Sequence, residues 1–134
     1  MRLSAIMKNK SLLLLLTVLT MPLLVQIANA QQSSPKATIL DTKTLTIKNP
    51  KFIDEGLNYS ITGTVINKSQ REAALIEVYA ILYDVNNNII NVAGAPADVS
   101  SLKPGEDSAF KVPFSPAQSH SEFPNHYTLL AGQN

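Results

Sequence analysis

The two histidines of this sequence, His120 and His126, lie close together with Glu122 between them. Imidazole nitrogens and carboxylates bind metals, so a metal-dependent hydrolase built on these three residues is one hypothesis. A metal site needs three or four convergent ligands, however, and an extended or looped chain scatters side chains at this spacing. We therefore expect no metal and no cofactor, and we interpret this segment as a polar connection before the last strand.

Ser119 next to His120 offers the residue types of a nucleophile and its base. Adjacent residues of an extended chain point to opposite sides, so the two side chains cannot act as a pair there. The Gly-x-Ser-x-Gly turn that exposes a nucleophilic serine in hydrolases does not occur in the sequence. The sequence therefore predicts a protein that is not an enzyme and has no catalytic residues.

The segment Asp-Val-Asn-Asn-Asn at 84–88 carries oxygen-bearing side chains at alternate positions, as the start of an EF-hand loop does. The sixth position of such a loop needs glycine for a sharp turn, and here it is Ile89. The twelfth needs a bidentate glutamate, and here it is Ala95. We interpret the segment as a hairpin turn whose asparagines tolerate a left-handed backbone.

Two segments satisfy the acceptor pattern for N-glycosylation, with Asn58 and Asn67 as the asparagines. Asn58 enters a predicted strand soon after a glycine and is the more accessible candidate. Asn67 stands at the predicted end of a strand, where an asparagine side chain can bond the backbone of its own turn. For Asn67 we therefore expect the structural role to be the stronger one.

The segment 75–84 has the period of a strand with one fully apolar face. If Val78 and its alternate neighbours face the core, then Tyr79, Ile81 and Tyr83 line the outer face of the same strand. Exposed rows of tyrosine and isoleucine can anchor partners, so these three residues are our candidate interaction surface. The alternative is that the connection 115–125 or the N-terminal segment covers them.

Turn residues recur at short intervals along the chain, which indicates many short strands. Seven strands of this length suit an all-β fold, an immunoglobulin-like antiparallel β-sandwich of two sheets. Gly63, inside one of these strands, predicts a bulge or the close approach of another element. The predicted strands cover residues 37–47, 58–67, 75–84, 89–95, 97–102, 108–114 and 127–132.

The tetrapeptide Lys-Pro-Gly-Glu at 103–106 has the composition of a type II turn. Pro104 supplies a φ near −65° at the second position, and Gly105 supplies the positive φ that the third position requires. Apolar residues resume their alternation soon afterwards, from Phe110. The pattern predicts two strands joined through this turn.

These motifs resemble the FxLYD family of small immunoglobulin-like domains. Residues 63–67 resemble the first Gly-x-Val-x-Asn strand of the family, 80–84 the strand that gives the family its name, and 102–110 its Leu-x-Pro-Gly-Glu turn. The resemblance covers about 59–130 and departs from the family at Ala80, where an aromatic residue is expected. It implies an exported immunoglobulin-like domain and no active-site residues.

The N-terminal segment has the three regions of a secretory signal peptide. Basic residues precede an apolar run, which ends with the small residues Ala28 and Ala30. We therefore expect a signal peptide at 1–30, a flexible N-terminus at 31–36 and a single FxLYD-like domain at 37–134, secreted or held in the cell envelope. No cysteine follows the apolar run, which excludes a lipoprotein; the alternative is an uncleaved membrane anchor.

Removal of 1–30 would leave eight basic against ten acidic side chains, a net charge near −2 rather than the +1 of the full chain. The remaining basic residues neither cluster nor interleave with aromatic residues, so we expect no nucleic-acid partner. Our leading hypothesis is an exported binding domain for an unknown protein or cell-envelope component. The alternatives are a structural accessory subunit that assembles through a sheet edge and the hydrolase hypothesis above.

Overall fold

The computed structural model describes residues 33–115 and 123–134. The chain divides into two units, Met1–Ser33 and Ser34–Asn134, and apart from Ser33 the described residues belong to the second. The predicted signal peptide therefore lies outside the described residues. Within the described residues, no helix is long and apolar enough to cross a membrane.

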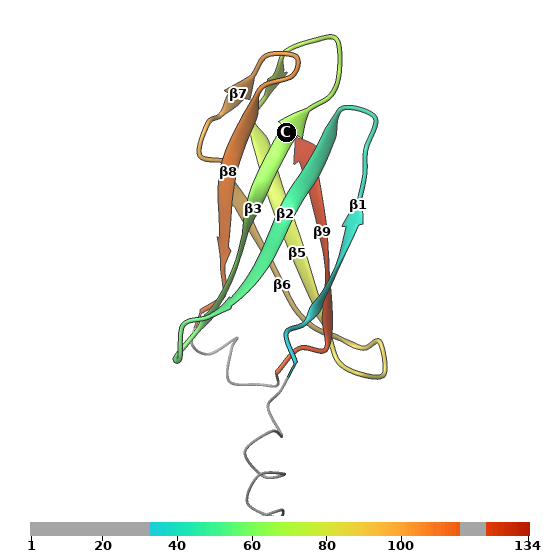
Figure 1. The fold of residues 1–134 in the computed structure, drawn as a ribbon, viewed down its shortest axis with the longest axis vertical. Helices are drawn as coiled ribbons and strands as arrows, with labels where there is room; N and C mark the ends of the chain where they lie inside the picture. Colours follow the sequence, from blue (N-terminus) through green and yellow to red (C-terminus); the bar gives the residue numbers. More distant parts are fainter. Residues whose placement is uncertain (1–32, 116–122) are drawn as a thin grey trace, which may run out of the picture. The chain divides into compact units, whose positions relative to one another are not determined.

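The domain is all-β, as the sequence predicts (Figure 1). Five of its strands match predicted ones closely in position. The predicted strand at 97–102 is reduced to two residues, 101–102, and the two-residue strand at 73–74 was not predicted. The strands are β1 (Lys36–Leu40), β2 (Leu45–Asp54), β3 (Tyr59–Asn67), β4 (Ala73–Ala74), β5 (Ile76–Tyr83), β6 (Ile89–Pro96), β7 (Ser101–Leu102), β8 (Asp107–Pro113) and β9 (His126–Gln133).

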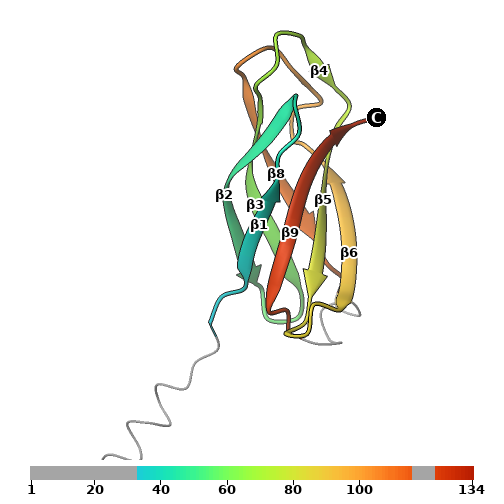
Figure 2. The ribbon, with the colours of Figure 1, turned by 90° about the vertical axis from the view of Figure 1, so that its right-hand side faces the viewer.

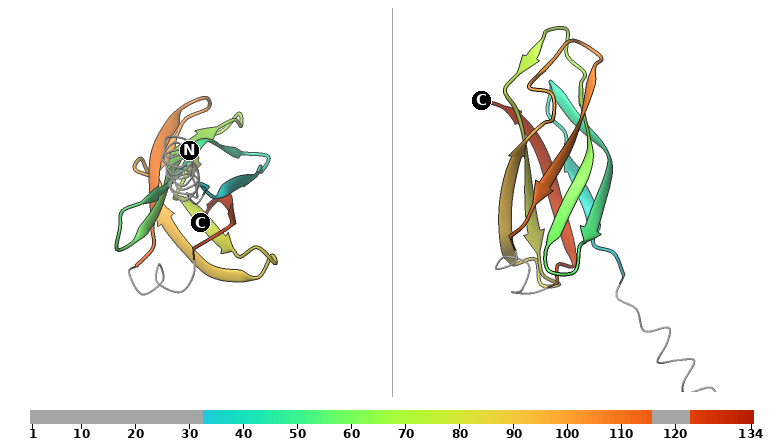
Figure 3. Two further views of the ribbon diagram at one scale, coloured as in Figure 1. Left: turned by 60° about the horizontal axis from the view of Figure 1, so that its bottom comes forward. Right: turned by 90° about the vertical axis from the view of Figure 1, so that its left-hand side faces the viewer.

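The strands form two main sheets and one short pair. One sheet has the order β1-β9-β5-β6, the other β2-β3-β8, and β4 pairs with β7. Figures 2 and 3 show the two main sheets as separate layers. β5 is an inner strand of the first sheet and pairs antiparallel with both β6 and β9.

The predicted strand at 37–47 is two strands in different sheets, and this is where the expectation of a wholly antiparallel sandwich fails. β1 pairs with β9 in parallel, from Lys36 opposite His126 to Leu40 opposite Leu130. The chain turns between β1 and β2 because the Thr42 hydroxyl donates to the carbonyl of Leu45 (3.1 Å) and accepts from its N–H (3.0 Å). A polar side chain thus ends one strand and starts the next.

The pairing follows immunoglobulin order in five strands. With β2, β3, β5, β8 and β9 taken as A, B, C, E and F, the sheets contain the neighbours A-B-E and C-F of that fold. The place beside F, which strand G fills in an immunoglobulin domain, is filled here by β1. The first strand of the domain therefore completes the sheet from the opposite end of the chain.

The core lies between the two sheets and receives side chains from both. β5 alternates between buried and half-buried residues along its whole length, with Ile76, Val78, Ala80 and Leu82 inside. The FxLYD pattern expects an aromatic residue at Ala80, which is fully buried. The largest aromatic side chains of the core come from other strands and loops, and they are Phe110, Phe114 and Tyr127.

Gly63 has both features that the sequence predicts for it. It lies in β3 opposite a bulge of β2, where the register shifts between Lys48 and Lys51 and Asn49 has a positive φ of 54°. On the core side, the ring of Phe110 lies where a side chain at Gly63 would begin, 2.8 Å from an ideal Cβ. Glycine is required because the buried ring occupies that space.

The type II turn at 103–106 is confirmed. Gly105 has a φ of 82°, and the N–H of Glu106 donates to the carbonyl of Lys103 (3.0 Å). The turn is also held from outside, because the N–H of Gly105 donates to the carbonyl of Asn67 (2.8 Å). A main-chain hydrogen bond therefore joins the turn before β8 to Asn67 at the end of β3.

We expect Gly105→Val to lower the free energy of unfolding by roughly 1 to 3 kcal/mol, because a β-branched residue is strained at positive φ. Gly132→Val is the matched control: it adds the same atoms in open space, at a residue without positive φ. Urea unfolding of both variants measures the difference. Equal midpoints would show that backbone strain at Gly105 is not what selects glycine there.

Candidate functional site

The outer face of the sheet β1-β9-β5-β6 carries a group of large apolar side chains, with Thr128 of β9 and Thr38 of β1 beside them. The strand register places Tyr79, Ile81 and Tyr83 on this face, as the sequence predicts, and brings residues of the neighbouring strands beside them. All three are half-buried, while Leu40 and Val92 expose 51% and 52% of their surface. We call this set the outer apolar face; its members are Leu40, Tyr79, Ile81, Tyr83, Val92 and Leu130.

Two contacts hold the side chain of Tyr79 in place on the outer face. Its ring lies over Gly94 of β6, 2.9 Å from where a Cβ would stand. Its hydroxyl donates to Glu77 Oε2 (3.0 Å), and this hydrogen bond to a carboxylate raises the pKa of Tyr79. The ring therefore forms a rigid part of the outer face.

Tyr83 is also held by a neighbour on the same face. Its ring stacks on the imidazole of His126 in β9, with centroids 4.9 Å apart and planes inclined by 9°. Nδ1 of His126 lies 3.0 Å from Oδ1 of Asn125. Aromatic side chains with few remaining degrees of freedom lose little entropy when a partner binds them.

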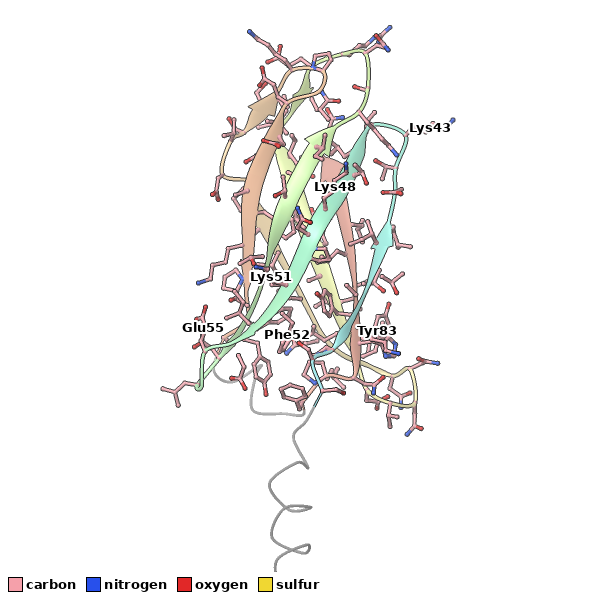
Figure 4. All side chains as sticks on the ribbon, viewed as in Figure 1. Lys43, Lys48, Lys51, Phe52, Glu55 and Tyr83 are labelled. Atoms are coloured by element: carbon pink, nitrogen blue, oxygen red, sulfur yellow. The ribbon has the colours of Figure 1, made fainter. Side chains whose placement is uncertain are left out.

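The other sheet presents a more polar outer face, on which threonines and lysines outnumber the apolar Ile53 and Ile66. Thr62 and Thr64 of β3 lie opposite Lys51 and Lys48 of β2, and the bulge between these lysines keeps both on the outer side. Figure 4 labels Lys48 and Lys51 on this strand. Such a polar face is the usual solvent surface of an antiparallel sheet.

Asp84 holds its hairpin together through its carboxylate. Oδ1 accepts hydrogen bonds from the N–H groups of Asn86 (2.8 Å) and Asn88 (2.9 Å). The bond from Asn88 has the larger effect, and both bonds lower the pKa of Asp84. Asn87 has a positive φ of 65°. The segment is the asparagine-rich turn that we predicted, with the carboxylate engaged by backbone groups.

Of the three residues in the hydrolase hypothesis, the structure describes only His126. His120 and Glu122, like Ser119, lie outside the described residues, and His126 takes part in the stack with Tyr83. Among residues 33–115 and 123–134, no group of three or more histidine and acidic side chains could hold a metal ion.

The two candidate glycosylation residues differ in burial. Asn58 is half-buried, and its amide donates one long bond to Glu55 (3.4 Å). Asn67 is completely buried, and its Nδ2 donates to the carbonyls of Arg71 (2.7 Å) and Leu102 (2.8 Å). A glycan on Asn67 would replace one N–H of Nδ2 and so remove at least one of these bonds, and Asn58 is the less buried of the two asparagines.

A small pocket adjoins one end of the outer apolar face, and sequence reasoning missed it. Its volume is about 240 Å³, and three strand ends surround it. The N–H of Asn134 donates to the carbonyl of Leu75 (3.2 Å), and that of Ala97 to the carbonyl of Ile76 (3.0 Å). The sequence carries no local signal for it, because its lining residues are far apart in the chain: Leu75, Ile76, Glu77, Pro96, Ser100 and Asn134.

The fold is an all-β sandwich whose two outer faces differ in their share of apolar side chains. No protein-family model and no curated protein matches the chain.

Two solved structures resemble it. One is a DUF1425 family member from Shewanella sp. pv-4, with 12% identity and a TM-score of 0.45 over 71% of this chain and 86% of that one. The other is cj0090 from Campylobacter jejuni, with 13% identity and a TM-score of 0.39 over 77% of this chain and 100% of that one.

Proposed function

We propose that this protein is an exported, non-catalytic domain of the FxLYD kind that binds a protein of the cell envelope through its outer apolar face. The observation that supports this most is the difference between the two sheets. One outer face is made mainly of threonines and lysines, with Ile53 and Ile66 among them, whereas the other has a larger share of large apolar side chains, grouped around Thr128. Apolar patches of this kind on a small domain mark sites of interaction.

The chemistry of the face favours a protein as the partner. Its apolar centre is bordered by Lys36 and Glu77 on β1 and β5, which is the arrangement of a protein interface with a polar rim. Tyrosine is enriched among the residues that contribute most to such interfaces. Tyr79 and Tyr83 are already held in place, so little side-chain entropy would be lost on binding.

The test compares one substitution on each sheet. We expect Ile81→Asp to weaken capture of the partner from envelope extracts by at least about tenfold, because a charge would enter the apolar centre. Thr62→Asp is the matched control, since Thr62 is also half-buried and faces outward from an inner strand. The bait is protein expressed from the full chain, and quantitative mass spectrometry compares the captured proteins. Equal recovery with both variants would contradict the proposal.

A structural accessory subunit that assembles through a sheet edge is the second candidate, and β1 favours it. The N–H of Lys36 points toward β9, where it donates to the carbonyl of Asn125 (3.3 Å). By alternation, Ala37 and Ile39 direct their main-chain groups away from β9. β1 contains no proline and is mostly exposed, so its edge is open to another strand. Oligomers that persist in the Ile81→Asp variant in sedimentation velocity would favour this candidate.

A further inference from the structure

We infer that the pocket beside the outer apolar face receives a lysine or arginine side chain of the partner protein. This inference rests on the proposed function and specifies the chemistry of the partner. The pocket begins where the face ends, because Glu77 and Pro96 are cross-strand neighbours on the outer side of β5 and β6. A protein that covers the face would therefore reach the pocket mouth as well.

Glu77 is the ionisable side chain among the residues that line the pocket. Its Oε2 accepts from the Tyr79 hydroxyl (3.0 Å) and from Asn134 Nδ2 (2.7 Å), so both bonds orient the carboxylate. Within residues 33–115 and 123–134, the single ion pair joins Lys111 and Glu55, and Glu77 takes no part in it. An oriented carboxylate without a cationic neighbour is complementary to an ammonium or guanidinium group.

The walls of the pocket suit the aliphatic part of such a side chain. Leu75 lines the mouth, exposes 62% of its surface and has a positive φ of 52°. Leucine rarely adopts this conformation, and strained residues of this kind concentrate at functional sites. Pro96 and Ile76 add apolar surface. Lysine and arginine bury their stems along such surfaces while the charged head reaches a polar group.

The size of the pocket limits what can enter. Sites for drug-sized molecules have volumes of roughly 300 to 1,000 Å³, and this one measures about 240 Å³. A single side chain is therefore the fitting occupant. The hydrogen bonds from Asn134 to Leu75 and from Ala97 to Ile76 hold the walls in place before binding.

The test uses Nα-acetyl-L-arginine amide as the probe and ¹⁵N-labelled protein expressed from the full chain. We expect saturable amide shifts confined to Leu75, Glu77, Ser100 and Asn134. Glu77→Gln should weaken binding about tenfold or more, because a charge-assisted hydrogen bond is lost while the size of the side chain is kept. The neutral isostere Nα-acetyl-citrulline amide should bind the unsubstituted protein as weakly as the arginine probe binds the Glu77→Gln variant.

A second variant separates the pocket from the stability of the fold. Leu75→Gly relieves the backbone strain of a leucine at positive φ, so we expect an unchanged or higher melting temperature. It also removes the Leu75 side chain from the pocket wall, so we expect weaker binding of the probe. Equal binding of the arginine and citrulline probes, or no saturable shifts at the pocket, would overturn the inference. Capture that depends on Ile81 would then still support the proposed function, so the two failures are distinguishable.

Discussion

Asn67→Ala is expected to lower the free energy of unfolding by roughly 3 kcal/mol or more, because each buried polar group left without a partner costs about 1 to 3 kcal/mol. Asn67 is completely buried. Its Nδ2 donates to the carbonyls of Arg71 and Leu102, and its Oδ1 accepts from the N–H (2.9 Å) and hydroxyl (2.7 Å) of Ser69. Urea unfolding with linear extrapolation measures the loss.

Two further variants show whether hydrogen bonding is the cause. Asn67→Asp keeps the shape but directs a carboxylate oxygen at two carbonyl groups, so we expect it to be at least as damaging as alanine. Asn58→Ala is the matched control, since Asn58 is half-buried and makes one long bond, and it should cost less than about 1 kcal/mol. Similar losses for Asn58→Ala and Asn67→Ala would contradict the structural role assigned to Asn67.

Gly63→Val is expected to cost roughly 3 kcal/mol, at the upper end for overpacked cores. Its Cβ would stand 2.8 Å from Cζ of Phe110 and 3.2 Å from the carbonyl oxygen of Lys48. Phe110 is 2% exposed, so moving its ring would displace other side chains of the core. Urea unfolding again gives the magnitude.

The control for Gly63→Val is Gly132→Val, which meets no atom within 4 Å. It should change stability by less than about 0.5 kcal/mol, as surface substitutions usually do. Gly63→Val combined with Phe110→Leu tests the mechanism, because a smaller side chain at 110 should recover part of the loss in a double-mutant cycle. Strictly additive losses would show that the two residues do not compete for the same space.

Several parts of the fold follow from short stretches of sequence. The alternation of 75–84 predicts both faces of β5, and the structure places Tyr79, Ile81 and Tyr83 on the outer one. The type II turn is readable from the tetrapeptide at 103–106, because Gly105 is the residue type that its φ of 82° favours. The asparagines of 84–88 likewise predict their own hairpin.

Other features depend on partners that are distant in the chain. The apolar pattern of 37–47 does not reveal that β1 and β2 belong to different sheets, or that β1 pairs in parallel with the last strand. The role of Asn67 was predicted only for its own turn, while its bond to Leu102 spans 35 residues. The pocket residues come from four separate segments.

The sequence by itself determined the all-β class, the inward and outward faces of β5 and the turns that need glycine or asparagine. These depend on the period of two along a strand and on the φ of single residues, and neighbouring residues set both. Only the tertiary structure decided that β1 completes the sheet beside β9, that Phe110 excludes a side chain at Gly63, and that Glu77 meets Leu75 and Asn134 around a pocket. Those arrangements arise from packing between strands far apart in sequence, where many pairings satisfy the same local pattern and the burial of one common core selects among them.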